Sequence, residues 1–313
     1  MIVSFVCGGL GNQLFQYAAG RRLAIRRGSE LALDVSGQYV DGRERERRAE
    51  VRPFAHPLLL FEFRVAARVA SADDCVRVGH RFTKRRLWHR LVRWLWQAWP
   101  SLAPRSQFRE RGYTFDPAVL DLADNTYLVG SWQSEKYFSD IGDVIRSDLE
   151  PRDKGVLEYA ADYMARLHSR ASQIVGVHVR RGERAYAADV LGKPDLFTSR
   201  AASAEYIQAA MSRFDGSAAF VVFSDSKADR EWCRRNLKGT NLFFSEGHTD
   251  VQDFVLMSRC DHNIIANSTF SWWAAWLNPN PGKRVIAPRA WFGPRFAASV
   301  STRDLLPAPW EVL

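Results

Sequence analysis

The sequence predicts an α/β protein that is built from two Rossmann-like domains with parallel sheets. The N-terminus opens with an apolar strand, a glycine-rich turn and a helix, which is the start of a βαβ unit. From residue 174 onward, short apolar runs alternate with helical segments, and this alternation is typical of a parallel sheet that helices cover on both faces. A chain of 313 residues is long for one hydrophobic core and suits two domains.

The first βαβ unit is expected to cover residues 2–34. Its turn, GGLGNQ at residues 8–13, begins like a dinucleotide-binding fingerprint, but Leu14 occupies the place of the third glycine. A nicotinamide cofactor and plain βα geometry are both open at this point, and the incomplete fingerprint favours plain geometry. The side chains of Asn12 and Gln13 add oriented amide donors to the free backbone N–H groups at the start of the helix.

Residues 36–52 are polar and charged and read as a solvated loop or short helices. Residues 84–105 form a basic segment rich in tryptophan. Apolar side chains recur there at helical spacing, among them Leu87, Leu91 and Trp94, between several Lys and Arg residues. A helix that packs on the core or a domain interface is favoured, with its arginine stems lying along apolar surface. Binding to an anionic membrane surface is the alternative. A nucleic-acid role has least support, because no nucleic-acid fold motif accompanies the charge.

The composition indicates a globular protein that attracts anions. Apolar residues make up 46% of the chain, and 44 Lys and Arg against 35 Asp and Glu give a net charge of +9. The four cysteines are far apart and form no metal-ligand spacing, so neither a disulfide framework nor a zinc site is expected, and a reducing compartment fits. The N-terminus lacks the features of a signal peptide, and no run reaches the ~18 apolar residues that a membrane-spanning helix needs.

A domain boundary is expected near residue 152, after a charged link, which gives domains at 1–152 and 153–313. In the first domain, residues 126–130 read as a closing strand and residues 138–149 as a helix. In the second domain, the apolar runs predict strands at 174–179, 219–223, 242–244, 263–266 and 284–287, with helices at 156–169, 203–214, 228–236, 250–259 and 269–277.

Three groups of polar residues follow strands of the second domain, at the carboxyl edge where ligands bind in open α/β sheets. The first is the pair Arg180 and Arg181, whose guanidinium groups suit phosphate oxygens. Because side chains alternate along a strand, Arg180 should point to the same face as His178, and Arg181 should point to the other face or into the turn.

The second group is NSTFS at residues 267–271, where Ser268 or Thr269 either caps the next helix or joins its free N–H groups in binding an anion. The third is Asp253, whose carboxylate either stabilises the helix dipole or accepts two parallel hydrogen bonds from a guanine. Together the three groups predict a site for a guanine nucleoside diphosphate.

Three motifs resemble a known family. GGLGNQLFQYA at residues 8–18, HVRRG at 178–182 and DFVLMSRCDHNIIANSTFSWWAAWLN at 253–278 look like glycosyltransferase family 11, the α-1,2-fucosyltransferases. The resemblance spans nearly the whole chain. It implies a GT-B-like arrangement of two facing Rossmann-like domains, in which the first binds the acceptor and the second binds GDP-fucose.

The resemblance also implies an inverting, metal-independent transfer of fucose to the 2-hydroxyl of a galactose, without a cofactor beyond the donor substrate. Arg180 and Arg181 would hold the pyrophosphate and stabilise the GDP leaving group. Two positions depart from the family pattern, because Glu183 stands where the arginine motif usually has Asp, and Ser226 stands where a second Asp usually follows Asp225. The residues expected to bind substrate are Gly9, Gly11, Asn12, Gln13, His178, Asp225, Asp253, Ser268 and Thr269.

The general base is open. Inversion needs the acceptor hydroxyl to lose its proton, ordinarily to Asp, Glu or His. Glu183 is the nearest carboxylate in sequence, although it could instead order the arginine pair. Asp34 of the first domain is a second candidate, and the departing phosphate is a third.

The sequence therefore predicts a cytoplasmic, bacterial-type α-1,2-fucosyltransferase that builds an O-antigen-like surface polysaccharide from GDP-fucose and a galactose-containing acceptor. Peripheral contact with the inner face of an anionic membrane, through residues 84–105, belongs to the same hypothesis, and nucleic acid does not. The alternatives are a GDP-fucose-dependent transferase with another acceptor or linkage, and a non-enzymatic basic protein of the membrane surface.

Overall fold

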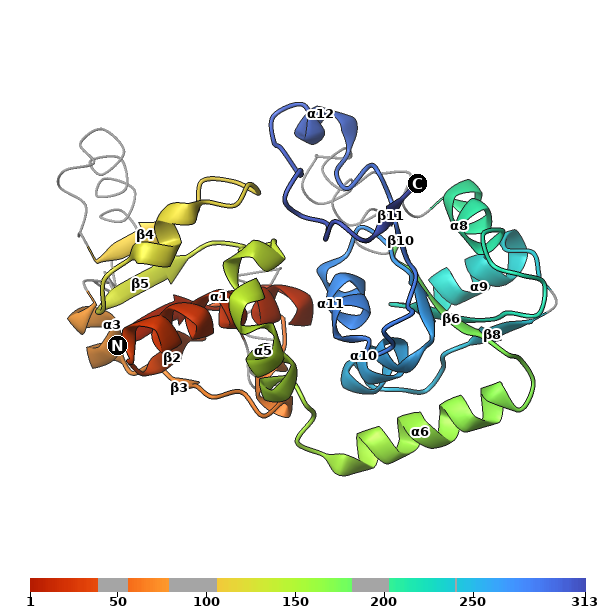
Figure 1. Ribbon diagram of the computed structural model, residues 1–313, viewed down its shortest axis with the longest axis horizontal. Coiled ribbons are helices and arrows are strands. Elements are labelled where there is room, and N and C mark those ends of the chain that lie inside the picture. Colours follow the sequence, from red (N-terminus) through yellow and green to blue (C-terminus); the bar gives the residue numbers. More distant parts are fainter. Residues whose placement is uncertain (39–55, 79–105, 182–202, 240) are drawn as a thin grey trace. The chain divides into compact units, whose positions relative to one another are not determined.

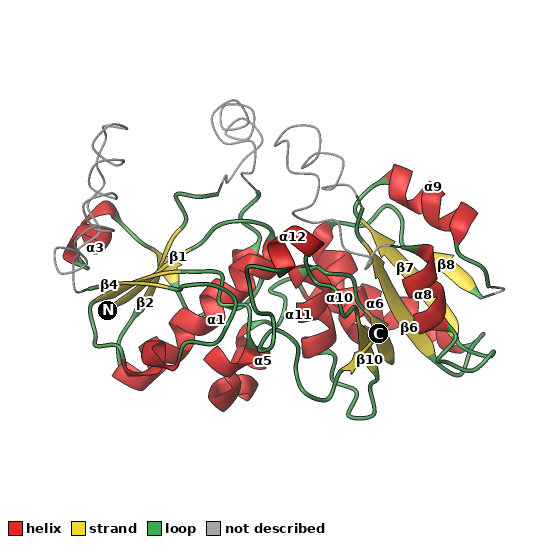
Figure 2. Cartoon of the chain, turned by 90° about the horizontal axis from the view of Figure 1, so that it is seen from above, coloured by secondary structure: helices red, strands yellow, loops and turns green. Residues whose placement is uncertain are grey.

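The computed structural model describes residues 1–38, 56–78, 106–181, 203–239 and 241–313 (Figure 1). The chain divides into two compact units, Met1–Leu149 and Glu150–Leu313. Each unit contains a parallel sheet with helices around it, so the predicted α/β class is confirmed (Figure 2).

The sheet of unit 1 has five described strands in the order β3-β2-β1-β5-β4, and every neighbouring pair is parallel. Its middle is apolar, and Ile2, Val3, Leu33 and Leu128 are all fully buried. The strands are β1 (Ile2–Phe5), β2 (Leu31–Asp34), β3 (Arg68–Val69), β4 (Gln107–Arg109) and β5 (Thr126–Val129). The α-helices are α1 (Leu10–Arg27), α3 (Ala72–Arg77) and α5 (Gly142–Asp148), and short 3₁₀ turns are η1 (Leu60–Glu62), η3 (Pro117–Asp121), η4 (Glu135–Tyr137) and η5 (Ser139–Ile141).

Helix α1 is the main helix of unit 1. It ends at Gly28, which adopts the left-handed conformation with φ of 58° and donates its N–H to a carbonyl of the last turn. Arg26 and Arg27 in that turn complement the negative end of the helix dipole. The buried Arg22 forms a fork with Asp140, in which Nη2 and Oδ2 are 2.9 Å apart. These contacts fix the helix whose first turn reaches the carboxyl edge of the sheet.

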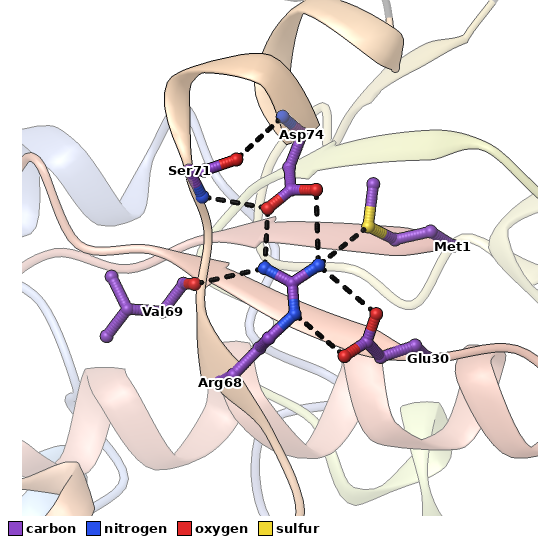
Figure 3. Close-up of polar contacts among 6 residues, drawn as sticks. All are labelled: Met1, Glu30, Arg68, Val69, Ser71 and Asp74. Atoms are coloured by element: carbon purple, nitrogen blue, oxygen red, sulfur yellow. Dashed lines mark hydrogen bonds and ion pairs between the residues drawn. The ribbon is translucent and has the colours of Figure 1, made fainter.

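The edge strand β3 is held by a second guanidinium (Figure 3). Arg68 donates to both oxygens of Glu30, with its shortest bond to that residue at 2.7 Å, and to both oxygens of Asp74. Asp74 also completes a capping box with Ser71 at the start of α3. The hydrogen bond from Arg68 holds the pKa of Asp74 well below its usual range, with further help from Ser71. One residue thus joins the strand edge to the helix that follows it.

The sheet of unit 2 has six described strands in the order β11-β10-β9-β6-β7-β8, again all parallel. The strands are β6 (Ile174–Val179), β7 (Ala219–Ser224), β8 (Leu242–Phe244), β9 (His262–Ile264), β10 (Val285–Ala287) and β11 (Glu311–Val312). The helices are α6 (Lys154–His168), α8 (Ala204–Met211), α9 (Lys227–Asn236), α10 (Asp250–Arg259), α11 (Thr269–Leu277) and α12 (Pro294–Ala297). Read from β6 outward, this is the strand order of dinucleotide-binding Rossmann folds.

Helices cover both faces of this sheet (Figure 1). Val175, Val177 and Val179 point to the face where α8 and α9 pack, and they share a core cluster with Ile207 and Cys233 of those helices. The opposite face of the sheet receives α10 and α11 (Figure 2). Because side chains alternate along β6, a residue that follows the strand points either toward α8 and α9 or toward α10 and α11.

Most predicted elements of unit 2 are present within one or two residues of their expected ends, but α8 ends three residues early. The expected helix at 138–149 is shorter, because 3₁₀ turns precede α5. The short strands β3, β4 and β11 were not predicted. The basic segment 84–105 and most of 36–52 lie outside the described residues. Among the helices that the structure does describe, none is both long and apolar enough to cross a membrane.

Candidate active site

The order of strands in unit 2 reverses between β6 and β9. The chain moves from β6 to β7 and β8 on one side, then returns to β9 on the other side of β6. Connections after β6 and β9 leave in opposite directions, and ligands of open α/β sheets bind in the crevice that this reversal opens at the carboxyl ends of the strands. Two predicted groups, the Arg pair after β6 and the segment 267–271 after β9, lie at this point.

Arg180 and Ser268 meet across this point. The Nη1 atom of Arg180 donates to Ser268 Oγ at 3.0 Å, although the two residues are 88 positions apart in the chain. On its other side, Arg180 Nε lies 3.4 Å from Asp225 Oδ2. The guanidinium side chain is about one quarter exposed (26%), so it is fixed in place and still accessible to a ligand. A cation held in this manner between a hydroxyl and a carboxylate is suited to bind an anion.

Asp225 follows β7 and carries the negative charge of the site. Its Oδ1 lies 3.7 Å from Nε2 of the buried His178. Partial withdrawal from water raises the pKa of Asp225, but the His178 imidazole and the Arg180 guanidinium outweigh this effect, and the net pKa is below its ordinary value. The carboxylate is therefore ionised at neutral pH and serves as the counterion of Arg180.

The ring of His178 is buried and faces Asp225. Its ring is 2% exposed and lies against Phe270 of α11, with ring centroids 5.5 Å apart. Because protein encloses the ring, the side chain of His178 is not available to a substrate. A substrate contact by the main chain of His178 stays a prediction.

Ser268 does not cap α11. It is the N-cap residue, but its side chain makes no capping hydrogen bond, and the hydroxyl accepts from Arg180 instead. No acidic residue occupies the first turn of α11, and Thr269 in that turn is half-buried. The free N–H groups of the helix start therefore add positive potential beside Arg180. Of the two interpretations of this segment, the geometry favours the anion site over plain capping.

Arg181 faces the other side of the sheet, as the strand alternation predicts. Its Cζ lies 3.7 Å from the centroid of the Trp232 ring on α9. This is a close cation–π contact. The structure therefore does not bring the two arginines together: Arg180 meets Ser268 and Asp225, whereas Arg181 is held on the face of α9.

Asp253 lies in the first turn of α10, at the same edge of the sheet. Its Oδ1 accepts hydrogen bonds from Ser245 Oγ at 2.5 Å and from His248 Nδ1 at 3.1 Å. The following residue, Phe254, packs against Phe270, which links this region to His178. Sequence reasoning missed Ser245 and His248, because neither belongs to a periodic apolar pattern or a known motif.

Unit 1 has its own reversal point, between β1 and β5. The turn after β1 presents bare backbone, because Gly8 has φ of 84° and a Cβ there would come within 2.6 Å of Asn12 Nδ2. Gly9 is the N-cap of α1, Gly11 is buried in its first turn, and no side chain caps the helix. Asn12 Oδ1 accepts from Gln133 Nε2 at 3.1 Å, which directs the Asn12 amino group away from Gln133.

Gln13 is a correction to the expected set of substrate contacts. Its side chain is fully buried, donates to the carbonyls of Gly8 and Pro57, and accepts from the N–H groups of Leu59 and Leu60. All four hydrogen bonds of the amide are thus used inside unit 1. Gln13 fixes the chain at 57–60 onto the helix start and has no polar atom left for a substrate.

Of the two carboxylates considered as general bases, the structure describes only Asp34. Asp34 is 4% exposed, its Oδ2 accepts from Tyr127 at 2.5 Å, and its Oδ1 accepts from the N–H of Ser36. These bonds give Asp34 a structural role between β2 and β5. Glu183 lies outside the described residues. Within the described parts of the chain, no group of three or more His, Cys, Asp or Glu side chains is placed to hold a metal ion.

Comparison with known families decides the class of this protein. The model of glycosyl transferase family 11 matches residues 87–304, which include Arg180, Asp225, Asp253 and Ser268. The chain belongs to glycosyl transferase family 11. The predicted family is therefore confirmed, the protein is a glycosyltransferase, and the non-enzymatic alternative loses its support.

Relatives of this family 11 glycosyltransferase cover most of its length. It is 28% identical over 300 residues to the alpha-1,2-colitosyltransferase of Escherichia coli, covering 93% of this chain and 92% of that protein. It is 26% identical over 311 residues to the O-antigen biosynthesis glycosyltransferase WbnK of Escherichia coli, covering 92% and 94%. It is also 28% identical over 280 residues to the galactoside alpha-(1,2)-fucosyltransferase 1 of Lagothrix lagotricha, covering 86% of this chain and 63% of that protein.

Among solved structures, the family 11 chain is similar in fold to the fucosyltransferase NodZ from Bradyrhizobium. The TM-score is 0.50 at 15% identity, and the match covers 94% of this chain and 96% of NodZ. Two units that each carry a parallel sheet, together with this likeness, bear out the GT-B-like fold class.

Proposed function

We propose that this protein transfers L-fucose from GDP-fucose to the 2-hydroxyl of a galactose in an O-antigen-like surface glycan. The observation that carries the proposal is Arg180, held between Ser268 and Asp225 at the point where the strand order of unit 2 reverses. A diphosphate bound there would meet a guanidinium fork and the uncapped start of α11. Relatives named for α-1,2 transfer, among them a galactoside fucosyltransferase, support the linkage and the acceptor.

In this proposal, the two domains bind different substrates. Residues 153–313 bind the donor, with the pyrophosphate on Arg180, Ser268 and Thr269 and the guanine on Asp253. Residues 1–152 bind the acceptor, and Gly9, Gly11 and Asn12 present backbone and amide donors at the carboxyl edge of the first sheet. Arg181, stacked on Trp232, supports the donor site from the opposite face of its sheet.

The proposed reaction is a single displacement at the anomeric carbon. The 2-hydroxyl oxygen of galactose bonds to C1 of fucose while the bond from C1 to the β-phosphate oxygen breaks, which inverts the configuration. The electron pair of that bond leaves with GDP, and the positive charge of Arg180 stabilises it where other transferases use a metal ion. The acceptor proton passes to Glu183 or to the departing phosphate. The transfer is then expected to proceed unchanged in the presence of a chelator.

A transfer assay tests the proposal. The purified protein is incubated with GDP-fucose and a β-galactoside in buffer that contains a chelator, and the linkage of the product is determined by NMR. We expect an α-1,2-fucosylated product from the wild type and none from Arg180→Ala at an unchanged melting temperature. Near-normal transfer by Arg180→Ala would overturn the site assignment. An α-linkage to another hydroxyl would overturn the regiochemistry.

The relative named for colitose supports a second donor. Fucose and colitose differ at a sugar carbon remote from the diphosphate, so the site around Arg180 would serve both. Competition between the two nucleotide sugars in the same assay separates the candidates, because the true donor is consumed with the higher kcat/KM.

A further inference from the structure

Asp253 and three side chains near it form a continuous hydrogen-bonded chain, which we call the Asp253 cluster: Tyr159, Ser245, His248 and Asp253. Tyr159 Oη lies 2.6 Å from His248 Nε2, and His248 Nδ1 lies 3.1 Å from Asp253 Oδ1. Ser245 is 2% exposed and bridges the two, since its Oγ donates to Asp253 Oδ1 at 2.5 Å and lies 2.6 Å from His248 Nδ1. The cluster joins α6, the loop after β8 and the start of α10.

The direction of the hydrogen bonds follows from the carboxylate at one end. Asp253 only accepts, so Ser245 Oγ–H points toward its Oδ1. In the tautomer with a proton on Nδ1, His248 shares this N–H between Ser245 Oγ at 2.6 Å and Asp253 Oδ1 at 3.1 Å. A neutral His248 then has a bare Nε2, which accepts the hydroxyl proton of Tyr159. Oδ1 is thereby occupied by two donors, whereas Oδ2 has no hydrogen bond to a described residue, and the side chain is 21% exposed. One oxygen of Asp253 is locked by protein and the other is presented outward.

The position of the cluster fits the far end of a nucleotide. Arg180 and Ser268 mark the reversal point between β6 and β9, and Ser245 follows β8, two strands away along the same carboxyl edge. Ring contacts from His178 to Phe270 and from Phe270 to Phe254 connect the two places. In folds of this strand order, a nucleotide with its diphosphate at the reversal point extends its nucleoside along the edge. Asp253 would then meet the base.

We infer that Tyr159, His248 and Ser245 are positioning residues that set the nucleobase selectivity of the donor site by fixing Asp253. The inference rests on the proposed function, because it assumes a nucleoside diphosphate on Arg180. With Oδ1 occupied, Asp253 accepts from the base through Oδ2 alone, rather than through two parallel bonds as the sequence suggested. A base with an N–H donor at that edge, as in guanine, gains a hydrogen bond to a carboxylate, and adenine, whose N1 is an acceptor, is repelled.

Calorimetric titration with GDP, ADP and inorganic pyrophosphate tests the inference. Pyrophosphate reports on Arg180 without a base. A hydrogen bond to a charged group, worth about 1.5–3 kcal/mol, corresponds to a roughly 10- to 150-fold preference for GDP over ADP in the wild type. We expect His248→Ala to weaken GDP binding by about 10-fold or more on the same scale while ADP and pyrophosphate stay within about twofold. His248→Asn should recover most of the preference, because its amide can replace the Nδ1–H donor.

Two tyrosines provide a matched comparison if the His248 variants fail to fold. Tyr159→Phe removes the hydroxyl that bonds to His248, and we expect about a threefold loss of the GDP preference. Tyr163 contacts the same imidazole only through its ring, with centroids 6.1 Å apart, so Tyr163→Phe should leave the preference unchanged. Melting temperatures of all variants establish that the fold is retained.

The outcomes separate the inference from the proposed function. A wild type that binds neither GDP nor pyrophosphate contradicts the nucleotide site itself, and the inference falls with it. A wild type that prefers GDP, together with folded His248→Ala and Tyr159→Phe proteins that keep the full preference, contradicts the inference alone.

Discussion

The two adjacent arginines after β6 should respond very differently to removal. Arg180 lies between Ser268 and Asp225 at the reversal point, whereas Arg181 is stacked on Trp232 across the sheet. We therefore predict that Arg180→Ala abolishes most GDP binding and that Arg181→Ala does not. The family resemblance assigns both arginines to the pyrophosphate, whereas strand alternation and the structure place them on different faces, so the comparison tests the arrangement rather than the motif.

The magnitude for Arg180 has two parts. Loss of charged hydrogen bonds to phosphate costs about 1.5–3 kcal/mol each. Removal of the guanidinium also leaves the ionised Asp225 without its nearby counterion, so the carboxylate repels the incoming phosphate. The sum is roughly 2–4 kcal/mol, or an increase in Kd of about 30- to 1000-fold. Arg181 acts on the same phosphate only through a screened Coulomb potential, about 1 kcal/mol or less and thus about fivefold in Kd.

Calorimetric titration of GDP into the wild type and both variants measures these changes. Thermal unfolding serves as the control, because Arg181→Ala removes a cation–π contact that is worth about 0.5–2 kcal/mol of stability. Equal losses of GDP affinity in two folded variants would contradict this prediction, since the two guanidinium groups have different surroundings in the structure.

Three further predictions concern single side chains. Gln13→Ala should lower the free energy of unfolding by roughly 2–4 kcal/mol in urea titration, because it leaves buried backbone groups unpaired. Asn12 is half-exposed, so Asn12→Ala should lower it only slightly, and equal losses would contradict the structural role of Gln13. Ser268→Ala should weaken GDP binding by about 3- to 10-fold without loss of stability. By contrast, loss of a true cap in Ser71→Ala, at the start of α3 in unit 1, should cost about 1 kcal/mol of stability and leave GDP binding intact. Asp74→Asn should lower the urea midpoint at pH 7. Since Arg68 depresses the pKa of Asp74, its stabilisation is present above about pH 4 and fades as the pH falls further, so the two proteins should converge in acid; a constant difference would contradict this.

The fold of unit 2 was predictable because its strands are short, apolar and separated by helices of regular period. Ile174–Val179 and Ala219–Ser224 are buried throughout and read as predominantly apolar runs. Two of the strands that were not predicted, β3 and β11, are edge strands of two residues each. They are too short to show an alternation of apolar and polar residues in the sequence. They exist because a neighbouring strand offers free backbone groups.

The candidate site was predictable in its residues and only partly in its arrangement. Strand alternation correctly separated Arg180 from Arg181, and the anion-binding interpretation of Ser268 is the one that the geometry favours. Gln13 was misassigned because a polar residue beside a glycine turn looks like a ligand contact, and only tertiary structure shows that the chain at 57–60 uses its amide. His248 could not be found, because it lies in an irregular loop without a motif, and its bond to Tyr159 joins residues 89 positions apart.

A crystal structure of the protein with GDP would show directly whether the diphosphate binds at Arg180. We expect diphosphate density at the reversal point of the unit 2 sheet, within hydrogen-bond distance of Arg180 and the Ser268 hydroxyl, with the guanine near Oδ2 of Asp253. Density for the diphosphate on the α9 face, beside Arg181 and Trp232, would contradict this expectation.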